Sequence, residues 1–217
     1  MPTNTQDADF ATRLQRYGLT PQDIRANMLR VSRDSVIYLG AAGNRQSYHV
    51  PRMLRCKDID DLKRWVGVPN SVFRQNTQAQ TRRAIPTRPP TSLIDKSAAV
   101  TAQLRGESNP QKVKELKDGL YRDLREHYGA LKQMTDAYVY GDSDLLVDWK
   151  GPLSYYQEQH LVPVWAYYDV VVESGAVLEF GEGTNVLSAK KLVIEQGGRI
   201  RATGSLTLNV SSIVRSN

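Results

Sequence analysis

A repeat near the C-terminal end of the chain decides the predicted fold. Residues 170–178 read Val-Val-Val-Glu-Ser-Gly-Ala-Val-Leu, and residues 192–200 read Leu-Val-Ile-Glu-Gln-Gly-Gly-Arg-Ile. Each copy holds an apolar strand, an acidic residue, a glycine turn and a second apolar strand, and the copies lie 22 residues apart. Strands that alternate with glycine turns at such a period are typical of a β-solenoid, in which equivalent strands pair in parallel.

The same shift assigns individual positions. Val172 corresponds to Ile194, and both should face the core. Gly175 corresponds to Gly197 at the corner, where glycine adopts positive φ without steric cost. The pattern resembles right-handed parallel β-helices over about 48 residues, and this likeness concerns architecture alone, because such folds carry many unrelated functions.

One feature of the repeat favours a different tail. Glu173 would lie beside Glu195 in neighbouring turns of a solenoid, and like charges at paired positions are destabilising. Glycine turns also serve hairpins, so an antiparallel β-sandwich is the alternative. We favour the parallel β-solenoid (β-helix-like), because strand, acid, glycine and second strand all recur together.

The N-terminal part is predicted to be mainly helical. Phe10, Leu14 and Tyr17 share one helix face, and Thr20-Pro21-Gln22-Asp23 reads as the start of a second helix that continues to about residue 33. Two such helices could form a DNA-reading helix-turn-helix, although an ordinary helical hairpin is the simpler interpretation. Residues 35–39 predict a short strand and residues 58–66 a short helix.

The strongest helical pattern spans residues 109–140. Asn109 is a suitable N-cap and Pro110 fits the first turn. We expect one helix, with any bend near Gly119 or Gly129, because glycine weakens a helix interior. Its apolar stripe consists of Val113, Leu116, Leu120, Leu124, Tyr128, Leu131, Met134 and Tyr138.

These elements give an α+β fold with four predicted regions. A basic, mainly helical N-terminal region covers residues 1–73, and a linker or strap covers residues 74–108. The long amphipathic helix and a turn occupy residues 109–148. The aromatic segment and the β-solenoid occupy residues 149–217.

The formal net charge of +6 comes from the N-terminal part of the chain. Residues 1–90 hold 15 Lys and Arg against 7 Asp and Glu. Arg82, Arg83 and Arg88 form the densest basic patch and are the candidate nucleic-acid contacts. Few aromatic residues interleave with them, so a base-stacking platform is not indicated. We expect nucleic-acid binding, if any, to be weak and nonspecific.

Aromatic residues concentrate just before the repeat, in residues 149–168. Their position suggests a cap over the open end of the solenoid, because a terminal turn of a repeat protein needs cover. The alternative is a platform that stacks on a glycan or a peptide. The residues concerned are Trp149, Tyr155, Tyr156, Trp165, Tyr167 and Tyr168.

No motif for catalysis or metal binding is present in the sequence. The acidic residues Asp142, Asp144 and Asp148 lack the glycine and the ligand number of a calcium loop. The three histidines and the single cysteine have no zinc-type spacing. Phosphate loops and nucleophile elbows are missing. We therefore predict no metal, no cofactor and no enzymatic activity.

Cys56 lies between Arg55 and Lys57, two cations that could lower the pKa of its thiol. A half-buried structural cysteine is the simpler interpretation. The N-terminus has neither a basic start nor an apolar run, and no stretch is long enough to span a membrane. We therefore expect a cytoplasmic protein, with export by a route that needs no such signal left open.

The last strand of the repeat suggests a function. Residues 205–210 alternate in polarity, and neither proline nor lysine guards this edge against further strand pairing. We predict a non-enzymatic structural protein that self-associates, or docks to another protein, through this edge. The alternatives are a glycan- or peptide-binding module and a nucleic-acid-associated protein. The assembly edge consists of Leu206, Thr207, Leu208, Asn209 and Val210.

Overall fold

The computed structural model describes residues 5–24, 28–40, 49–75, 88–158 and 160–216. The chain forms two compact units. The strand-rich unit combines Met1–Leu54 with Leu161–Asn217, and the helical unit is the continuous segment Arg55–His160. The fold is therefore α+β, with the helical unit inserted between two segments of the strand-rich one.

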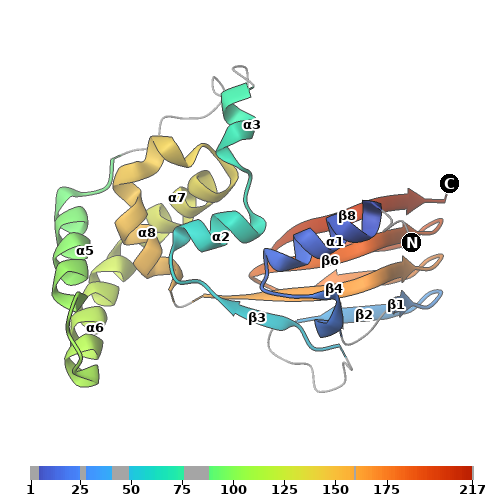
Figure 1. The fold of residues 1–217 in the computed structure, drawn as a ribbon, viewed down its shortest axis with the longest axis horizontal. Coiled ribbons are helices and arrows are strands. Elements are labelled where there is room, and N and C mark those ends of the chain that lie inside the picture. Colours follow the sequence, from blue (N-terminus) through green and yellow to red (C-terminus); the bar gives the residue numbers. More distant parts are fainter. Residues whose placement is uncertain (1–4, 25–27, 41–48, 76–87, 159, 217) are drawn as a thin grey trace. The chain divides into compact units, whose positions relative to one another are not determined.

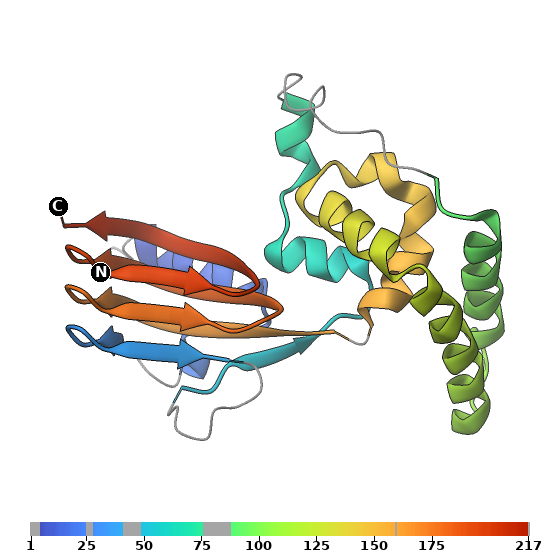
Figure 2. The same cartoon turned by 180° about the vertical axis from the view of Figure 1, so that it is seen from behind.

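Two parallel sheets make up the strand-rich unit, which is seen from both sides in Figure 1 and Figure 2. The long sheet has the order β1-β4-β6-β8, and β3 also pairs with β4. Its strands are β1 (Met28–Val31), β3 (Arg52–Arg55), β4 (Leu161–Val172), β6 (Thr184–Ile194) and β8 (Ser205–Arg215). The short sheet has the order β2-β5-β7, with β2 (Val36–Leu39), β5 (Val177–Phe180) and β7 (Arg199–Ala202).

The pairs β4–β6 and β5–β7 follow the predicted 22-residue shift, whereas β6 and β8 pair at a shift of 21 residues, with Leu187 opposite Leu208. Val172 pairs with Ile194 in the long sheet, and Leu178 pairs with Ile200 in the short sheet. We call one long-sheet strand together with the short-sheet strand that follows it a layer. One layer was not predicted from the repeat. It comes from β1 and β2, where Leu29 pairs in parallel with Val170 of β4.

The predicted β-solenoid is nevertheless wrong, because the strands form two flat parallel sheets of unequal extent. β4, β6 and β8 have 12, 11 and 11 residues, whereas β2, β5 and β7 have four each. The short sheet therefore covers only part of the long one, and the chain does not coil as equal turns around a closed core. The alternative antiparallel sandwich is also wrong, since the pairs β1–β4, β4–β6, β6–β8, β2–β5 and β5–β7 are all parallel.

A continuous apolar core lies between the two sheets. The side chains that form it are almost entirely excluded from water, and each such burial stabilises the fold by roughly 1.5–3 kcal/mol for a large aliphatic residue. The core consists of Leu29, Val31, Leu39, Trp165, Tyr167, Val170, Val172, Ala176, Leu178, Phe180, Leu187, Ala189 and Leu192.

The three turns that lead from the long sheet to the short sheet (β1 to β2, β4 to β5 and β6 to β7) each contain one residue with positive φ. Gly175 and Gly197 adopt φ values of 72° and 75°, as expected for glycine corners. In the first layer the equivalent residue is Asp34, with a φ of 56°. Aspartate is among the few residues that tolerate this conformation.

The repeated glutamates bind the neighbouring turn. The Glu173 carboxylate accepts hydrogen bonds from the Arg33 N–H (2.9 Å) and the Arg30 guanidinium (3.0 Å). The Glu195 carboxylate accepts one from the Ser174 N–H (3.1 Å). Backbone donors thus stabilise both charges, which removes the objection that stacked glutamates would repel each other.

The N-terminal helix α1 (Thr5–Gln15) packs on β6 and β8 (Figure 1). Phe10 and Leu14 are buried beneath it, as the predicted helix face requires. The predicted second helix is wrong. Only the short 3-10 helix η1 (Pro21–Asp23) forms, and the strand β1 follows. Leu29 and Val31 are buried alternately in β1, which is the period of a strand, so the helix-turn-helix hypothesis fails as well.

The helical unit contains six α-helices and one 3-10 helix among its described residues. They are α2 (Ile59–Val66), α3 (Asn70–Gln75), α5 (Thr91–Leu104), α6 (Pro110–Glu126), α7 (Tyr128–Tyr140), η2 (Ser143–Trp149) and α8 (Lys150–Gln157). The helix predicted at residues 58–66 is confirmed, with Asp58 as its N-cap. The long predicted helix is two helices, because His127 leaves helical geometry at φ −109° and ψ 18°.

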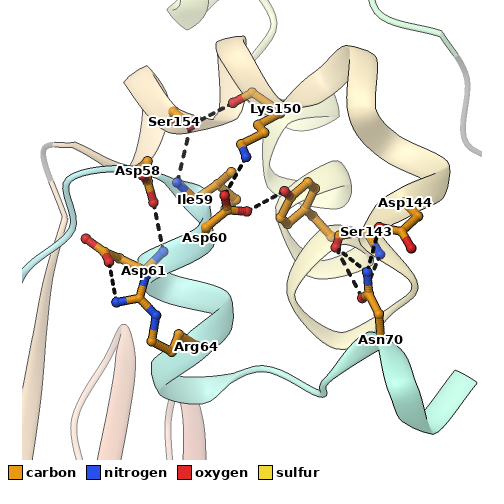
Figure 3. Close-up of polar contacts among 11 residues, drawn as sticks. Asp58, Ile59, Asp60, Asp61, Arg64, Asn70, Ser143, Asp144, Lys150 and Ser154 are labelled. Carbon is orange, nitrogen blue, oxygen red and sulfur yellow. Dashed lines mark hydrogen bonds and ion pairs between the residues drawn. The ribbon is translucent and has the colours of Figure 1, made fainter. Parts of the chain in front are cut away.

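Polar contacts join α2 to α7 and α8, and they join α3 to η2 (Figure 3). The Asp60 carboxylate accepts hydrogen bonds from the Tyr138 hydroxyl (2.6 Å) and pairs with the Lys150 ammonium (2.5 Å). The Ser154 hydroxyl accepts a bond from the Ile59 N–H (3.3 Å). Burial alone would raise the pKa of Asp60, but the bonds from Lys150 and Tyr138 outweigh it and hold the pKa below its usual value.

We expect this network to make stability depend on acidic pH. A carboxyl with a lowered pKa stabilises the folded state above its unfolded pKa, and this contribution disappears as pH falls through the folded pKa. Asp60→Asn should therefore lower the urea midpoint of the helical unit at pH 6, and the gap to wild type should narrow towards pH 3. Asp136→Asn, at an exposed position of α7, is the control. A gap that persists unchanged in acid would contradict the role of the Asp60 charge.

Candidate functional site

The predicted assembly edge lies on β8, which ends the long sheet in the described part of the chain. The Ser205 N–H donates to the Gly183 carbonyl of the preceding layer (2.9 Å). Alternate residues of a parallel strand direct their N–H groups to the same neighbour. The N–H groups of Leu206, Leu208 and Val210 therefore point away from β6 and are available to a further strand.

Side-chain burial changes abruptly at this edge. Leu187 and Leu192 of β6 are 0% exposed, whereas their register partners Leu208 and Ile213 of β8 are 43% and 56% exposed. The short sheet explains the difference. Its strand β7 follows β6, but no described strand follows β8 to cover the same positions. The long sheet thus extends one strand beyond the short sheet in the described part of the chain, and apolar side chains of this strand, β8, are exposed to water. We call this exposed end of the core the open step.

The burial of the side chains on the two faces of β8 differs from the prediction, which placed Leu206, Leu208 and Val210 together in the core. Leu206 and Val210 are half-buried against the core, but Leu208 of the same predicted face is exposed. The opposite face contacts α1 and the turn that follows it, where the Asn209 side-chain amide donates to the Tyr17 hydroxyl (2.9 Å). The N-terminal helix therefore packs on the face of β8.

The predicted aromatic platform does not form one surface. Trp149, Trp165 and Tyr167 are buried at 3%, 2% and 4% exposure. Tyr168 packs against Phe10 of α1, with the ring centroids 5.5 Å apart. Trp165 and Tyr167 belong to the sheet core, so the proposed cap over a solenoid is replaced by residues inside the two-sheet core.

The other two predicted aromatics, Tyr155 and Tyr156, line a cavity of about 220 Å³ that we call the tyrosine pocket. Rings from three helices meet there. The Tyr128 and Tyr156 rings are edge to face at 5.9 Å, and the Tyr156 and His160 rings are 5.1 Å apart. The full lining is Tyr121, Leu124, Arg125, Tyr128, Tyr155, Tyr156 and His160.

Two of the four tyrosine hydroxyls in this pocket form contacts outside it. The Tyr121 hydroxyl donates to the Glu158 carboxylate (3.1 Å), which also pairs with Lys117. The Tyr155 hydroxyl shares a hydrogen bond with Thr101 (2.9 Å). Burial, followed by the Tyr128 hydroxyl, raises the pKa of Tyr156 to about 12. The pocket thus presents ring surfaces rather than acidic groups.

Sequence reasoning missed Tyr121, Tyr128, Arg125 and His160 as members of this site. Tyr128 recurs at helical spacing with the leucines of α6 and was assigned to the buried stripe. Its side chain is 57% exposed. The helix break at His127 explains this, because it rotates the start of α7 relative to the stripe of α6.

A second cavity, of about 390 Å³, lies in the strand-rich unit. The His49 and Tyr167 rings meet there edge to face at 5.7 Å, and burial lowers the pKa of His49. The Asp23 carboxylate accepts bonds from the Thr20 hydroxyl and N–H, which hold its pKa below the usual range. Its lining is Gly18, Leu19, Asp23, His49, Val50, Pro51, Arg52, Met53, Val164, Ala166 and Tyr167.

Of the three arginines proposed as nucleic-acid contacts, the structure describes Arg88. Arg82 and Arg83 lie outside the described residues. Arg88 is exposed and pairs with Asp148 at 3.4 Å. Its charge is thus partly neutralised by an acidic neighbour.

The other titratable candidates have structural partners. Asp144 pairs with Arg74 at 2.5 Å. Within the described ranges, no group of three or more His, Cys, Asp or Glu side chains is placed to hold a metal ion. Cys56 is fully buried, and burial raises the pKa of its thiol to about 12. An activated thiol between Arg55 and Lys57 is therefore wrong.

Comparison of the chain with protein-family models, curated proteins and solved structures finds no match. Every helix in the described part of the chain is too short or too polar to traverse a lipid bilayer.

Proposed function

We propose that this chain is a non-enzymatic assembly protein and that the β8 edge binds a second copy by strand addition. The exposure of Leu208 and Ile213, at positions whose register partners in β6 are fully buried, supports this proposal above all. β8 has 11 residues, contains no proline and carries one charge, Arg215 at its end. Long edges with so little protection favour pairing with another strand.

A second copy is the favoured partner because the opposite end of the unit is also an edge. Among the described strands, β1 ends the long sheet and β2 ends the short sheet. Met28, Val36 and Tyr38 on these strands are 46%, 62% and 42% exposed. Joining the β8 end of one copy to the β1 end of the next would produce an open polymer, whereas joining two β8 edges would stop at a dimer.

Light scattering coupled to size-exclusion chromatography tests the proposal. Ile213→Lys places a charge at an exposed position of β8, and lysine on an edge strand discourages pairing. The Ser216 N–H bonds the Ile194 carbonyl (3.1 Å), so the N–H of Ile213 points away from β6. Leu145→Lys, at a 70% exposed position of η2, is the matched control.

We expect the mass of wild type and of Leu145→Lys to rise with concentration, and Ile213→Lys to remain a monomer. Circular dichroism must show that all three chains keep their strands. The proposal fails if wild type stays monomeric at high micromolar concentration, or if both lysine variants assemble equally well.

Two further properties belong to this proposal. We place the protein in the cytoplasm, since a single buried thiol at Cys56 needs no oxidising compartment. We also expect nucleic acid to bind only weakly and without sequence preference, through the excess of basic residues in the N-terminal part of the chain.

A further inference from the structure

We propose that the tyrosine pocket of the helical unit binds a planar aromatic ring that carries a carboxylate. The walls of the pocket are the first argument. Three tyrosine rings, those of Tyr121, Tyr155 and Tyr156, are half-buried, and Tyr128 stands at the rim. At about 220 Å³ the cavity is smaller than pockets for drug-sized ligands, which have roughly 300–1,000 Å³. One ring system would fill it.

The arrangement of the rings suits an aromatic guest. Tyr128 meets Tyr156 edge to face at an interplanar angle of 77°. His160 is tilted by 56° against the same Tyr156 ring, and its Nδ1 donates a hydrogen bond to the Tyr156 carbonyl oxygen (2.9 Å). Rings held in this way offer both an electron-rich face and electropositive edges to a further ring.

A sugar ring fits this pocket less well. It would need several free donors and acceptors for its hydroxyl groups, because polar groups buried without partners are costly. The hydroxyls of Tyr121 and Tyr155 are occupied by Glu158 and Thr101. The pocket wall is therefore rich in ring surface, and two of its hydroxyls already have hydrogen-bond partners.

The charge at the rim selects an anion. Arg125 lines the pocket and is exposed, and it takes part in none of the ion pairs found among the described residues. The nearby Glu158 is neutralised by Lys117. A cationic guest, which aromatic cages often bind, would meet the like charge of Arg125. A carboxylate instead matches the forked donors of the guanidinium.

This site is independent of the proposed assembly edge. Its residues all belong to the helical unit, whereas β8 belongs to the strand-rich unit. Loss of ligand binding therefore leaves the self-association test untouched, and the reverse also holds.

Calorimetry with indole-3-acetate tests the proposal, with indole-3-acetamide and methyl glucoside as matched probes. We expect indole-3-acetate to bind, and the neutral amide to bind at least about tenfold more weakly, because it lacks the charge-assisted bond. Arg125→Gln should bring the acid down to the level of the amide. Tyr128→Ala should weaken both indole probes, and Leu145→Ala, at a 70% exposed position of η2 outside the pocket, should change neither.

Tyr128 is 57% exposed, so its removal should not unfold the chain, and circular dichroism checks this. The proposal is overturned if no indole probe binds at millimolar concentration. It is equally overturned if methyl glucoside binds more tightly than the acid, or if Arg125→Gln leaves the preference for the acid over the amide unchanged.

Discussion

Replacing Leu192 with alanine should lower the free energy of unfolding of the strand-rich unit by about 2–5 kcal/mol. Leu192 is 0% exposed and belongs to the core between the sheets. Truncation removes buried methyl groups and leaves a cavity that the flanking strands cannot close. Ile213 occupies the same register position one layer on, so Ile213→Ala is a matched control. At 56% exposure, it should cost less than about 1 kcal/mol.

Urea unfolding followed by circular dichroism measures both values, with the protein dilute enough to remain monomeric. The comparison isolates burial, because both side chains come from paired positions of neighbouring parallel strands. If the two alanine variants lost equal stability, Ile213 would be buried in solution and the open step at β8 would not exist.

Gly204→Ala should destabilise the same unit by about 1–3 kcal/mol. A Cβ at this position would overlap the backbone of Gly183 in the turn below and lie 2.6 Å from its nitrogen. Backbone atoms cannot move aside as a flexible side chain would, so the two turns must separate. The same substitution at Gly119 should have the opposite sign. Nothing lies within 4 Å of a Cβ there, and alanine is favoured over glycine inside a helix by about 0.5–1 kcal/mol.

Thermal or urea unfolding of the two alanine variants checks this contrast, with probes that report on strands and helices separately. Stabilisation by Gly204→Ala would show that the turns at residues 183 and 204 are not in contact. Destabilisation by Gly119→Ala would show that α6 is more crowded on that side than the structure indicates.

The 22-residue repeat predicted the pairing of β4 with β6 and of β5 with β7, but not the register of β8 or the shape of the sheets. Periodicity specifies which residues are equivalent, and Val172 does pair with Ile194. It does not specify how far each strand extends, and the unequal lengths of the two sheets decided against a solenoid. The first layer, formed by β1 and β2, was not recognised in the sequence for another reason. Asp34 replaces the corner glycine, so residues 28–39 lack the signature by which the other layers were recognised.

Helix prediction was correct at the start of α6, where the N-cap signal is strong. It was wrong for the segment that forms β1, where buried and exposed side chains alternate. Asn109 caps α6 as predicted, with its side chain accepting from the N–H groups of Gln111 and Lys112. Met28 and Val31 fitted a helical stripe in the sequence, yet pairing with β4 makes this segment a strand. The tyrosine pocket could not be predicted, because Tyr121 and Tyr128 come together with Tyr156 only through the packing of three helices.

The insertion of the helical unit delays the pairing of β1 with β4 during synthesis of the chain. Leu29 pairs with Val170, which is made 141 residues later. At the usual synthesis rate of ~5–20 residues per second, β1 waits roughly 7–30 s for its partner strand to emerge. During this interval Leu29 and Val31, fully buried in the finished protein, have no sheet to enter. The continuous segment Arg55–His160 can fold meanwhile. The part of the sheet that leaves the ribosome first is therefore among the last to be protected from water.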